Sequence, residues 1–417
     1  MELLTDLAII LAKVIGLTFM VVLPLVPISV YFERRFSAII QDRVGPNRVG
    51  IPLTLFGAKK DYHLFGLVQP MADGLKLFLK EDFTPNYVRK SFYWLAPALT
   101  VIPSLVTVCV VPFGSSITIG GEEHKLVIAD LDVGPLFVFA VSSLTVYGIT
   151  LAGWSSNSKY PFVGGVRSTA QMISYEIALG LSIIPLLLYY GDLNLSSIVQ
   201  HQADHGWLLL PFWGNDSGPP LVEKLVFLVP ALIAFVIFTT SIFAETNRMP
   251  FDLPECETEL VGGYHTEYSS MKFAMFFMGE YAAMVIGSAL IVTLFLGGWS
   301  IGFGLDAAIS DLAFGGLIHM GVFMTKLIAF ILFFILVRWT VPRFRYDQLM
   351  RLGWVVFFEA ALINVFLAAF VIAAPDLGWI STIVGLVLLA IVTGALIWVL
   401  KTSDPKHSPN SGLLGQN

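Results

Sequence analysis

Long runs of apolar residues dominate the pattern of this 417-residue chain. A helix that crosses a membrane needs roughly 20 consecutive, mainly apolar residues. Strands of a membrane barrel would be shorter and would alternate in polarity, so the pattern predicts an all-α polytopic membrane protein. Nine segments qualify as spans: residues 7–31, 92–113, 134–154, 170–190, 223–244, 273–297, 315–341, 354–374 and 377–400.

Composition agrees with the pattern and limits the chemistry of the chain. The sequence is 56% hydrophobic and 13% charged, whereas soluble domains carry about 25% charged residues. Two cysteines, Cys109 and Cys256, are too few for a four-cysteine iron–sulfur cluster. His319 is the only histidine in the predicted spans, which argues against a haem held by two histidines. These counts argue against an iron–sulfur cluster or a two-histidine haem on this chain.

Lys and Arg are concentrated on one side of the predicted spans, which sets the orientation. Cytoplasmic loops are enriched in Lys and Arg, so the N-terminus is expected outside. The loops on the other side contain a single basic residue, Lys125. Residues 1–402 are expected to form one membrane domain and residues 403–417 a flexible tail. The cytoplasmic loops are then residues 32–91, 155–169, 245–272 and 342–353.

Two of these inner loops have opposite charge. The acidic loop, residues 245–272, has six acids and two bases, whereas the basic loop, residues 32–91, has ten bases and six acids. Because complementary fields fix the register of an interface, we expect the two loops to pack on each other.

Four carboxylates, Glu176, Glu245, Glu280 and Glu359, lie in or at the edge of the predicted spans, all in the inner half. A charge at the bilayer centre costs on the order of 2.5–3.5 kcal/mol on insertion scales. Each acid could simply pair with a base or a backbone group. Four in one half of one bundle favour a row of groups that handles protons or cations.

Several inner segments combine Gly, Pro and paired charges. Pro70 begins a predicted amphipathic helix that places Asp73 and Lys76 on one face. The segments are Glu33–Arg35, Gln41–Gly50, Gln69–Leu77, Gly153–Tyr160, Ala170–Glu176, Ala244–Glu255, Glu259–Tyr268 and Pro342–Met350.

From about residue 30 to residue 354, these segments closely resemble the H-subunit family of bacterial respiratory complex I, whose mitochondrial homologue is called subunit 1. The resemblance implies a subunit of a proton-pumping NADH:quinone oxidoreductase in the bacterial inner membrane, inactive alone. It would build much of a quinone tunnel and dock the peripheral arm beside other membrane-arm subunits. Quinone, either ubiquinone or menaquinone, would be the substrate, and FMN and iron–sulfur clusters would lie on partner subunits. No nucleic-acid partner is implied.

The same resemblance assigns residues to two groups. The quinone-tunnel and interface group contains Glu33, Arg34, Arg43, Asp73, Lys76, Arg248, Arg343, Arg345 and Asp347. The proton-path and acidic-loop group contains Glu176, Glu245, Asp252, Glu255, Glu257, Glu259, Glu267 and Glu280. No catalytic residue and no metal ligand is implied.

The chain also departs from the family pattern. Residues 51–66 look like an insertion in the basic loop, and Glu359 stands where the family has no acid. We interpret Glu359 as the partner of a nearby arginine, the alternative being an added proton site. Three other functions stay open: a membrane subunit of an ion-pumping hydrogenase or of a ferredoxin- or F420-linked oxidoreductase, a stand-alone ion transporter, and a purely structural anchor. A transporter with inverted repeats has no support, since no internal repeat is seen.

Overall fold

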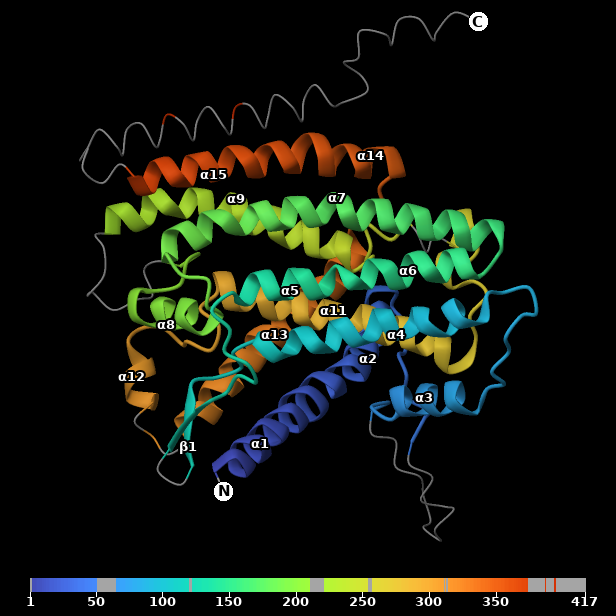
Figure 1. Cartoon of the computed structure of the whole chain (residues 1–417), viewed down its shortest axis with the longest axis horizontal. Coiled ribbons are helices and arrows are strands. Elements are labelled where there is room, and N and C mark those ends of the chain that lie inside the picture. The colour runs from blue at the N-terminus through green and yellow to red at the C-terminus, as the bar shows by residue number, and fades with distance from the viewer. Residues whose placement is uncertain are drawn as a thin grey trace, which may run out of the picture.

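The computed structural model describes residues 2–50, 65–119, 122–210, 221–253, 257–310, 312, 314–373, 387 and 394. This part of the chain is almost entirely helical (Figure 1). In chain order the elements are α1 (Glu2–Lys13), η1 (Val14–Val22), α2 (Leu23–Ile40), α3 (Gln69–Leu79), α4 (Lys90–Val106), η3 (Thr107–Val110), β1 (Ser116–Ile119), β2 (Glu122–Lys125), α5 (Gly134–Ser142), α6 (Leu144–Ser155), α7 (Lys159–Tyr190), α8 (Leu195–His205), α9 (Leu221–Glu245), α10 (Glu257–Leu260), η5 (Gly263–His265), α11 (Ser270–Phe295), α12 (Leu305–Ser310), α13 (Gly315–Thr340), α14 (Tyr346–Arg351), η6 (Leu352–Phe357) and α15 (Phe358–Ala373).

Eight helical segments in the described part are long and apolar enough to cross a membrane, which confirms the polytopic all-α prediction. They are Leu7–Ile40, Lys90–Val110, Gly134–Ser155, Lys159–Tyr190, Lys224–Glu245, Ser270–Phe295, Gly315–Thr340 and Tyr346–Ala373. The predicted ninth span, residues 377–400, and the tail lie outside the described residues, apart from residues 387 and 394. Most of the predicted insertion does too.

The first span continues to Ile40 instead of ending near residue 31. The apolar run stops at the charges of Glu33 and Arg34, but the helix does not. Glu33 is buried against other helices, whereas Arg34 points away and pairs with Asp73 of α3 at 2.8 Å. Charged residues can extend a helix beyond its apolar run when each finds a partner on its own face.

The interior of the bundle is built around α11. In its most apolar stretch 72% of the residues are buried, the largest fraction among the eight spans. Phe243 and Phe334 stack with ring centroids 3.9 Å apart, which joins α9 to α13. Helices α6 and α7 approach closely at Gly153, where an added Cβ would lie 2.6 Å from the carbonyl oxygen of Pro161. Small residues permit such close crossings between membrane helices.

The two ends of the bundle differ. At one end lie α8, α12 and the antiparallel pair β1–β2, in which Ser116 is opposite Lys125 (Figure 1). At the other end lie α3 and the loops predicted to be cytoplasmic. We call these the outer end and the inner end, following the predicted orientation. None of these elements was predicted. The strands and α12, with 4 and 6 residues, are too short to leave a period in the sequence, whereas α8, with 11 residues, was missed.

Candidate functional site

A buried charged cluster lies at the inner end of the bundle. Arg248, 5% exposed, contacts Glu280 of α11 at 2.9 Å and Glu33 of α2 at 3.4 Å. Burying a single ion is costly unless it is paired and hydrogen-bonded. The guanidinium therefore pairs with two carboxylates from two different helices. These ion pairs offset the free-energy cost of burying each charge.

Two further residues complete this cluster and were missed by the sequence interpretation. Arg338, in the last turn of α13, pairs with the second carboxylate oxygen of Glu33. The Tyr281 hydroxyl donates to Glu33 at 2.5 Å, and the Arg248 guanidinium lies 3.9 Å from the centroid of the Tyr281 ring. A charge inside an apolar run is the signal that identified the four acids, and applied to Arg338 it would have found this residue. Nothing in the sequence marks Tyr281.

Glu245, the last residue of α9, extends the cluster through small cavities. Two cavities of about 50 and 40 Å³ are both lined by Glu245 and Thr246, and the smaller also reaches Glu280. Hydroxyl groups of Ser104 and Thr145 line both cavities. A cavity that holds a water needs about 10–15 Å³ of such volume and polar partners, so each is large enough for water beside Glu245, and the smaller one can hold water between Glu245 and Glu280. Glu176 is near enough to Glu245 for their charges to interact.

Helix α7 positions the start of the acidic loop. The Gln171 side chain, fully buried, donates to the carbonyl oxygens of Ala244 at 2.8 Å and Phe251 at 2.9 Å. One turn later, the Tyr175 hydroxyl donates to the Leu349 carbonyl oxygen at 2.9 Å, at the end of α14. The segment Ala170–Glu176 therefore fixes two inner loops as well as supplying an acid.

The basic and acidic loops contact each other, but their ion pairs run opposite to the expectation. Arg248–Glu33 and Lys272–Asp82, at 3.4 and 2.9 Å, both join a base of the acidic loop to an acid of the basic loop. Net charge predicted the contact correctly but not its chemistry. The minority charges pair because they lie on the faces that meet, and bulk charge does not reveal faces.

Acids of the acidic loop pair with bases of α7 and of the loop after α13. Glu259 contacts Arg167 at 2.9 Å, and Asp252 contacts Arg343 at 3.3 Å. All four side chains keep some exposure, and exposed pairs contribute about 0–1 kcal/mol. They therefore fix geometry more than stability.

Aromatic contacts hold the end of the acidic loop against α4. The Tyr93 and Tyr268 rings stack with centroids 4.1 Å apart, and the Tyr93 hydroxyl donates to the Glu267 carbonyl oxygen at 2.7 Å. The Tyr87 hydroxyl donates to the Glu267 carboxylate at 2.7 Å, and this bond raises the pKa of Tyr87. Burial raises the pKa of Tyr268. Both phenols stay protonated at neutral pH and act as donors.

The remaining candidate residues lie apart from the cluster. Arg43, Lys76, Arg345 and Asp347 are exposed, with Arg345 and Asp347 3.3 Å apart. Asp73, which was expected to share a helix face with Lys76, forms its ion pair with Arg34 of α2. Glu255 lies outside the described residues, and Glu257 begins α10. Glu359 is exposed and has no ion pair with any residue in the described ranges, so the expected arginine partner is not found there.

Among the described residues, no group of three or more His, Cys, Asp or Glu side chains is arranged to hold a metal ion. What the site offers chemically is a group of buried carboxylates: Glu33 and Glu280 are balanced by guanidiniums, and Glu280 and Glu245 line a small cavity. Together with the polytopic fold, this defines a membrane protein with buried charged groups close to its inner loops.

Comparisons with known proteins identify its family. The NADH dehydrogenase family model matches residues 12–369. The chain is 45% identical over 368 residues to an H subunit of the NADH-quinone oxidoreductase of Geobacter metallireducens, covering 88% of this chain and 97% of that protein. It is 43% identical over 387 residues to the H subunit of the same enzyme in Leptospira biflexa, covering 90% and 99% respectively. It is 43% identical over 341 residues to an H subunit from Cytophaga hutchinsonii, covering 81% and 89%. The chain belongs to the NADH dehydrogenase family, and its relatives are membrane subunits of an oxidoreductase complex.

Proposed function

We propose that this chain is a subunit of a proton-pumping NADH:quinone oxidoreductase in a bacterial cell membrane, where it couples quinone reduction to proton movement. The names of its relatives support the redox complex over a hydrogenase or a stand-alone transporter. The observation that supports the coupling role is a continuous series of contacts between charged groups. Arg248 joins Glu33 to Glu280, and a cavity joins Glu280 to Glu245.

Quinone would enter from the bilayer beside α3. This helix has no buried residue, and Met71, Leu75 and Phe78 are exposed. The Arg34–Asp73 pair holds α3 against α2. An exposed amphipathic helix that lies at the membrane interface offers an apolar surface to a long-tailed lipid-soluble substrate. The chain itself would carry no redox cofactor, and FMN and iron–sulfur clusters would belong to partner subunits.

Those partner subunits would dock on the inner loops. Arg43, Lys76, Arg345 and Asp347 are exposed there, and Glu259 and Glu267 present carboxylates beside them. Charges on the rim of an interface steer association and fix register more than they add affinity. Peripheral-arm subunits that bind the quinone headgroup are the partners that such a surface suits.

The cluster provides a physical route from redox state to proton movement. Reduction of a quinone to a quinol takes up two protons, which changes the field around Glu33. If Glu33 gains a proton, Arg248 loses one of its two anionic partners and interacts more strongly with Glu280. Carboxylates that interact this closely titrate as a group. The proton occupancy of Glu280, Glu245 and Glu176 would then change together.

The test replaces Glu245 or Glu280 with glutamine in the assembled complex, reconstituted in sealed vesicles. Glutamine keeps the shape but carries no exchangeable acid proton. Because a positioned proton-transfer group is worth about 10²–10⁴-fold in rate, we expect proton translocation driven by quinone reduction to fall by at least about tenfold. Quinone reduction and vesicle acidification are followed together.

Glu359→Gln is the matched control, because Glu359 is a membrane carboxylate that lies exposed and outside this line. It should leave both rates unchanged. Normal pumping in Glu245→Gln and Glu280→Gln would contradict the proposed path. The purified chain alone should move no ions, whereas a stand-alone transporter would.

A further inference from the structure

A second buried cluster lies at the outer end, far along α11 and α13 from the first. Its centre is Lys326, within the seventh span. The ammonium donates to the carbonyl oxygens of Leu296, Gly298 and Ser300 at 2.7, 3.0 and 2.5 Å. These carbonyls follow the C-terminal end of α11, where the helix dipole favours a cation. A lysine at this depth is costly and marks a functional site by default.

A line of polar side chains leads from this lysine toward the outer surface. The Ser300 hydroxyl, on the residue whose carbonyl binds Lys326, donates to Asp306 at 2.6 Å. Asp306 lies 3.6 Å from Nε2 of His319. Nδ1 of His319 is 2.7 Å from the hydroxyl oxygen of Ser115. Ser300 and His319 are fully buried and Asp306 is 6% exposed, so the line runs through the protein interior.

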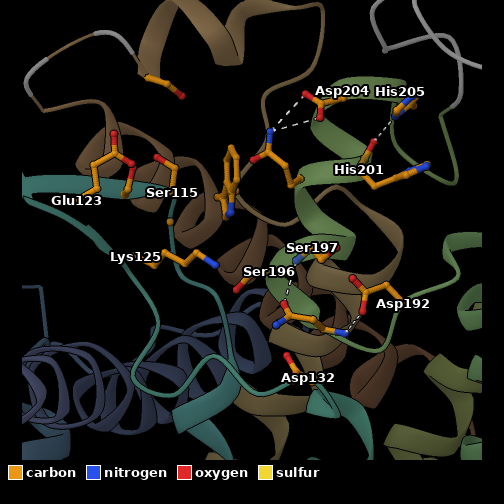
Figure 2. Close-up of a pocket in the computed structure, with 16 residues that line it drawn as sticks. Ser115, Glu123, Lys125, Asp132, Asp192, Ser196, Ser197, His201, Asp204 and His205 are labelled. Atoms are coloured by element: carbon orange, nitrogen blue, oxygen red, sulfur yellow. Dashed lines mark hydrogen bonds between the residues drawn. The ribbon is translucent and has the colours of Figure 1, made fainter.

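Ser115 opens this line to a large polar pocket. The pocket has a volume of about 690 Å³ and is lined by the β1–β2 region, α8 and the residues around α12. Figure 2 shows Ser115, Glu123 and Lys125 on one side of it and His201 and Asp204 on the other. A pocket of this size with mainly polar and charged lining holds water.

We infer that Ser115, His319, Asp306 and Ser300 form a proton path that connects the outer pocket to Lys326. The inference rests on the proposed function, since it needs proton movement to be driven by the complex. It adds an outer exchange route that the inner carboxylates do not provide. The purely structural alternative is that Lys326 caps α11 and that Asp306 and His319 tie α12 to α13.

Each transfer conserves the proton. The Lys326 side chain moves from the Ser300 carbonyl to the Ser300 hydroxyl, which passes one proton to the Asp306 carboxylate and regains one from the ammonium. Protonated Asp306 gives its proton to Nε2 of neutral His319, and Nδ1–H of the same ring releases a proton to Ser115 and the pocket. Lys326 is left as a neutral amine, and Asp306 returns to a carboxylate.

Asp306 is held ready for this role by its donors. Burial favours the neutral acid, but the neighbouring His319 ring, the hydrogen bond from the Ser300 hydroxyl and those from the N–H groups of Ile301 and Gly302 together outweigh it and lower the pKa of Asp306. The carboxylate therefore rests ionised between Ser300 and His319 and can accept a proton from the Ser300 hydroxyl.

The test uses substitutions that keep hydrogen bonding but cannot relay a proton. Arginine at Lys326 preserves the cation but does not release its proton below about pH 12, and Asp306→Asn and His319→Gln remove the two relay groups. In the assembled complex in vesicles, we expect quinone-driven acidification to be lost while assembly and thermal stability persist. A purely structural role would give the opposite result, preserved pumping in Lys326→Arg.

Ser116→Ala is the matched control, because Ser116 lines the same pocket but is not in the path. It should pump normally. If a buried variant does not assemble, Ser115→Ala decides, since it removes one hydroxyl at the pocket edge. Pumping equal to that of Ser116→Ala would then overturn the inference. If the outer variants pump normally while Glu245→Gln does not, only the outer path is contradicted. If the outer variants and Glu245→Gln all pump normally, the proposed function is contradicted as well.

Discussion

Replacement of Arg248 by methionine is expected to destabilise the folded chain by about 3–5 kcal/mol, because removing one partner of a buried ion pair leaves an uncompensated charge. Two carboxylates, Glu33 and Glu280, would lose their shared cation. The measurement is the denaturant midpoint of the purified complex together with the amount of chain recovered in membranes.

Arg345→Met is the control for Arg248→Met. Arg345 also forms an ion pair, with Asp347, but both side chains are more than two-thirds exposed. Its loss should cost less than about 1 kcal/mol. Adding Glu280→Gln to Arg248→Met should restore part of the stability by removing one unpaired charge. Equal small losses in the two arginine variants would show that the buried cluster contributes little.

An alanine at Gly164 is expected to push the acidic loop away from α7. The new Cβ would lie 2.8 Å from backbone atoms of Gly263 and Tyr264, and backbone cannot move aside as a flexible side chain does. Overpacking of this kind costs about 1–3 kcal/mol. We expect lower thermal stability and reduced quinone-driven proton translocation, because the loop that carries Arg248 is displaced at its far end.

Gly180→Ala provides the contrast within the same helix. Nothing lies within 4 Å of an added Cβ at Gly180. Alanine is favoured over glycine in a helix by about 0.8–1.0 kcal/mol, so this variant should be as stable as the parent or slightly more stable. If Gly164→Ala behaved like Gly180→Ala, the loop would not depend on this close contact.

The fold was largely predictable because apolar runs of membrane length leave a strong pattern. Eight of the predicted spans coincide with described helices, and α3 forms where Pro70 and the amphipathic period predicted it. The end of the first span was wrong, because partners for Glu33 and Arg34 come from distant segments. Hydropathy counts residues along the chain and contains no information about such partners.

The candidate site was predictable as a set of residues but not as an arrangement. The sequence separated Glu33 from the proton-path acids, whereas Arg248 connects it to Glu280. Arg248 stands among the acids of its own loop in the sequence, yet it pairs with two acids outside that loop. Glu33 is 215 positions away, and Glu280 lies on α11. Which helix faces meet is decided by packing of the whole bundle. The sequence could therefore mark Arg338 as a charge in an apolar run, but it could not show that Arg338 and Tyr281 meet Glu33.

The ion pairs between the two inner loops change the charged surface that a partner subunit contacts, because they use bases of the acidic loop and acids of the basic loop. Because Arg248 and Lys272 neutralise Glu33 and Asp82, each loop keeps more of its majority charge than its composition indicates. Exposed charges of both signs, such as Arg43 and Lys76 of the basic loop and Glu259 of the acidic loop, remain at the inner surface. Fields between exposed charges are screened over about 8 Å at physiological ionic strength. Raising the salt concentration should therefore slow the association of partner subunits while leaving the desolvated interior of the chain intact.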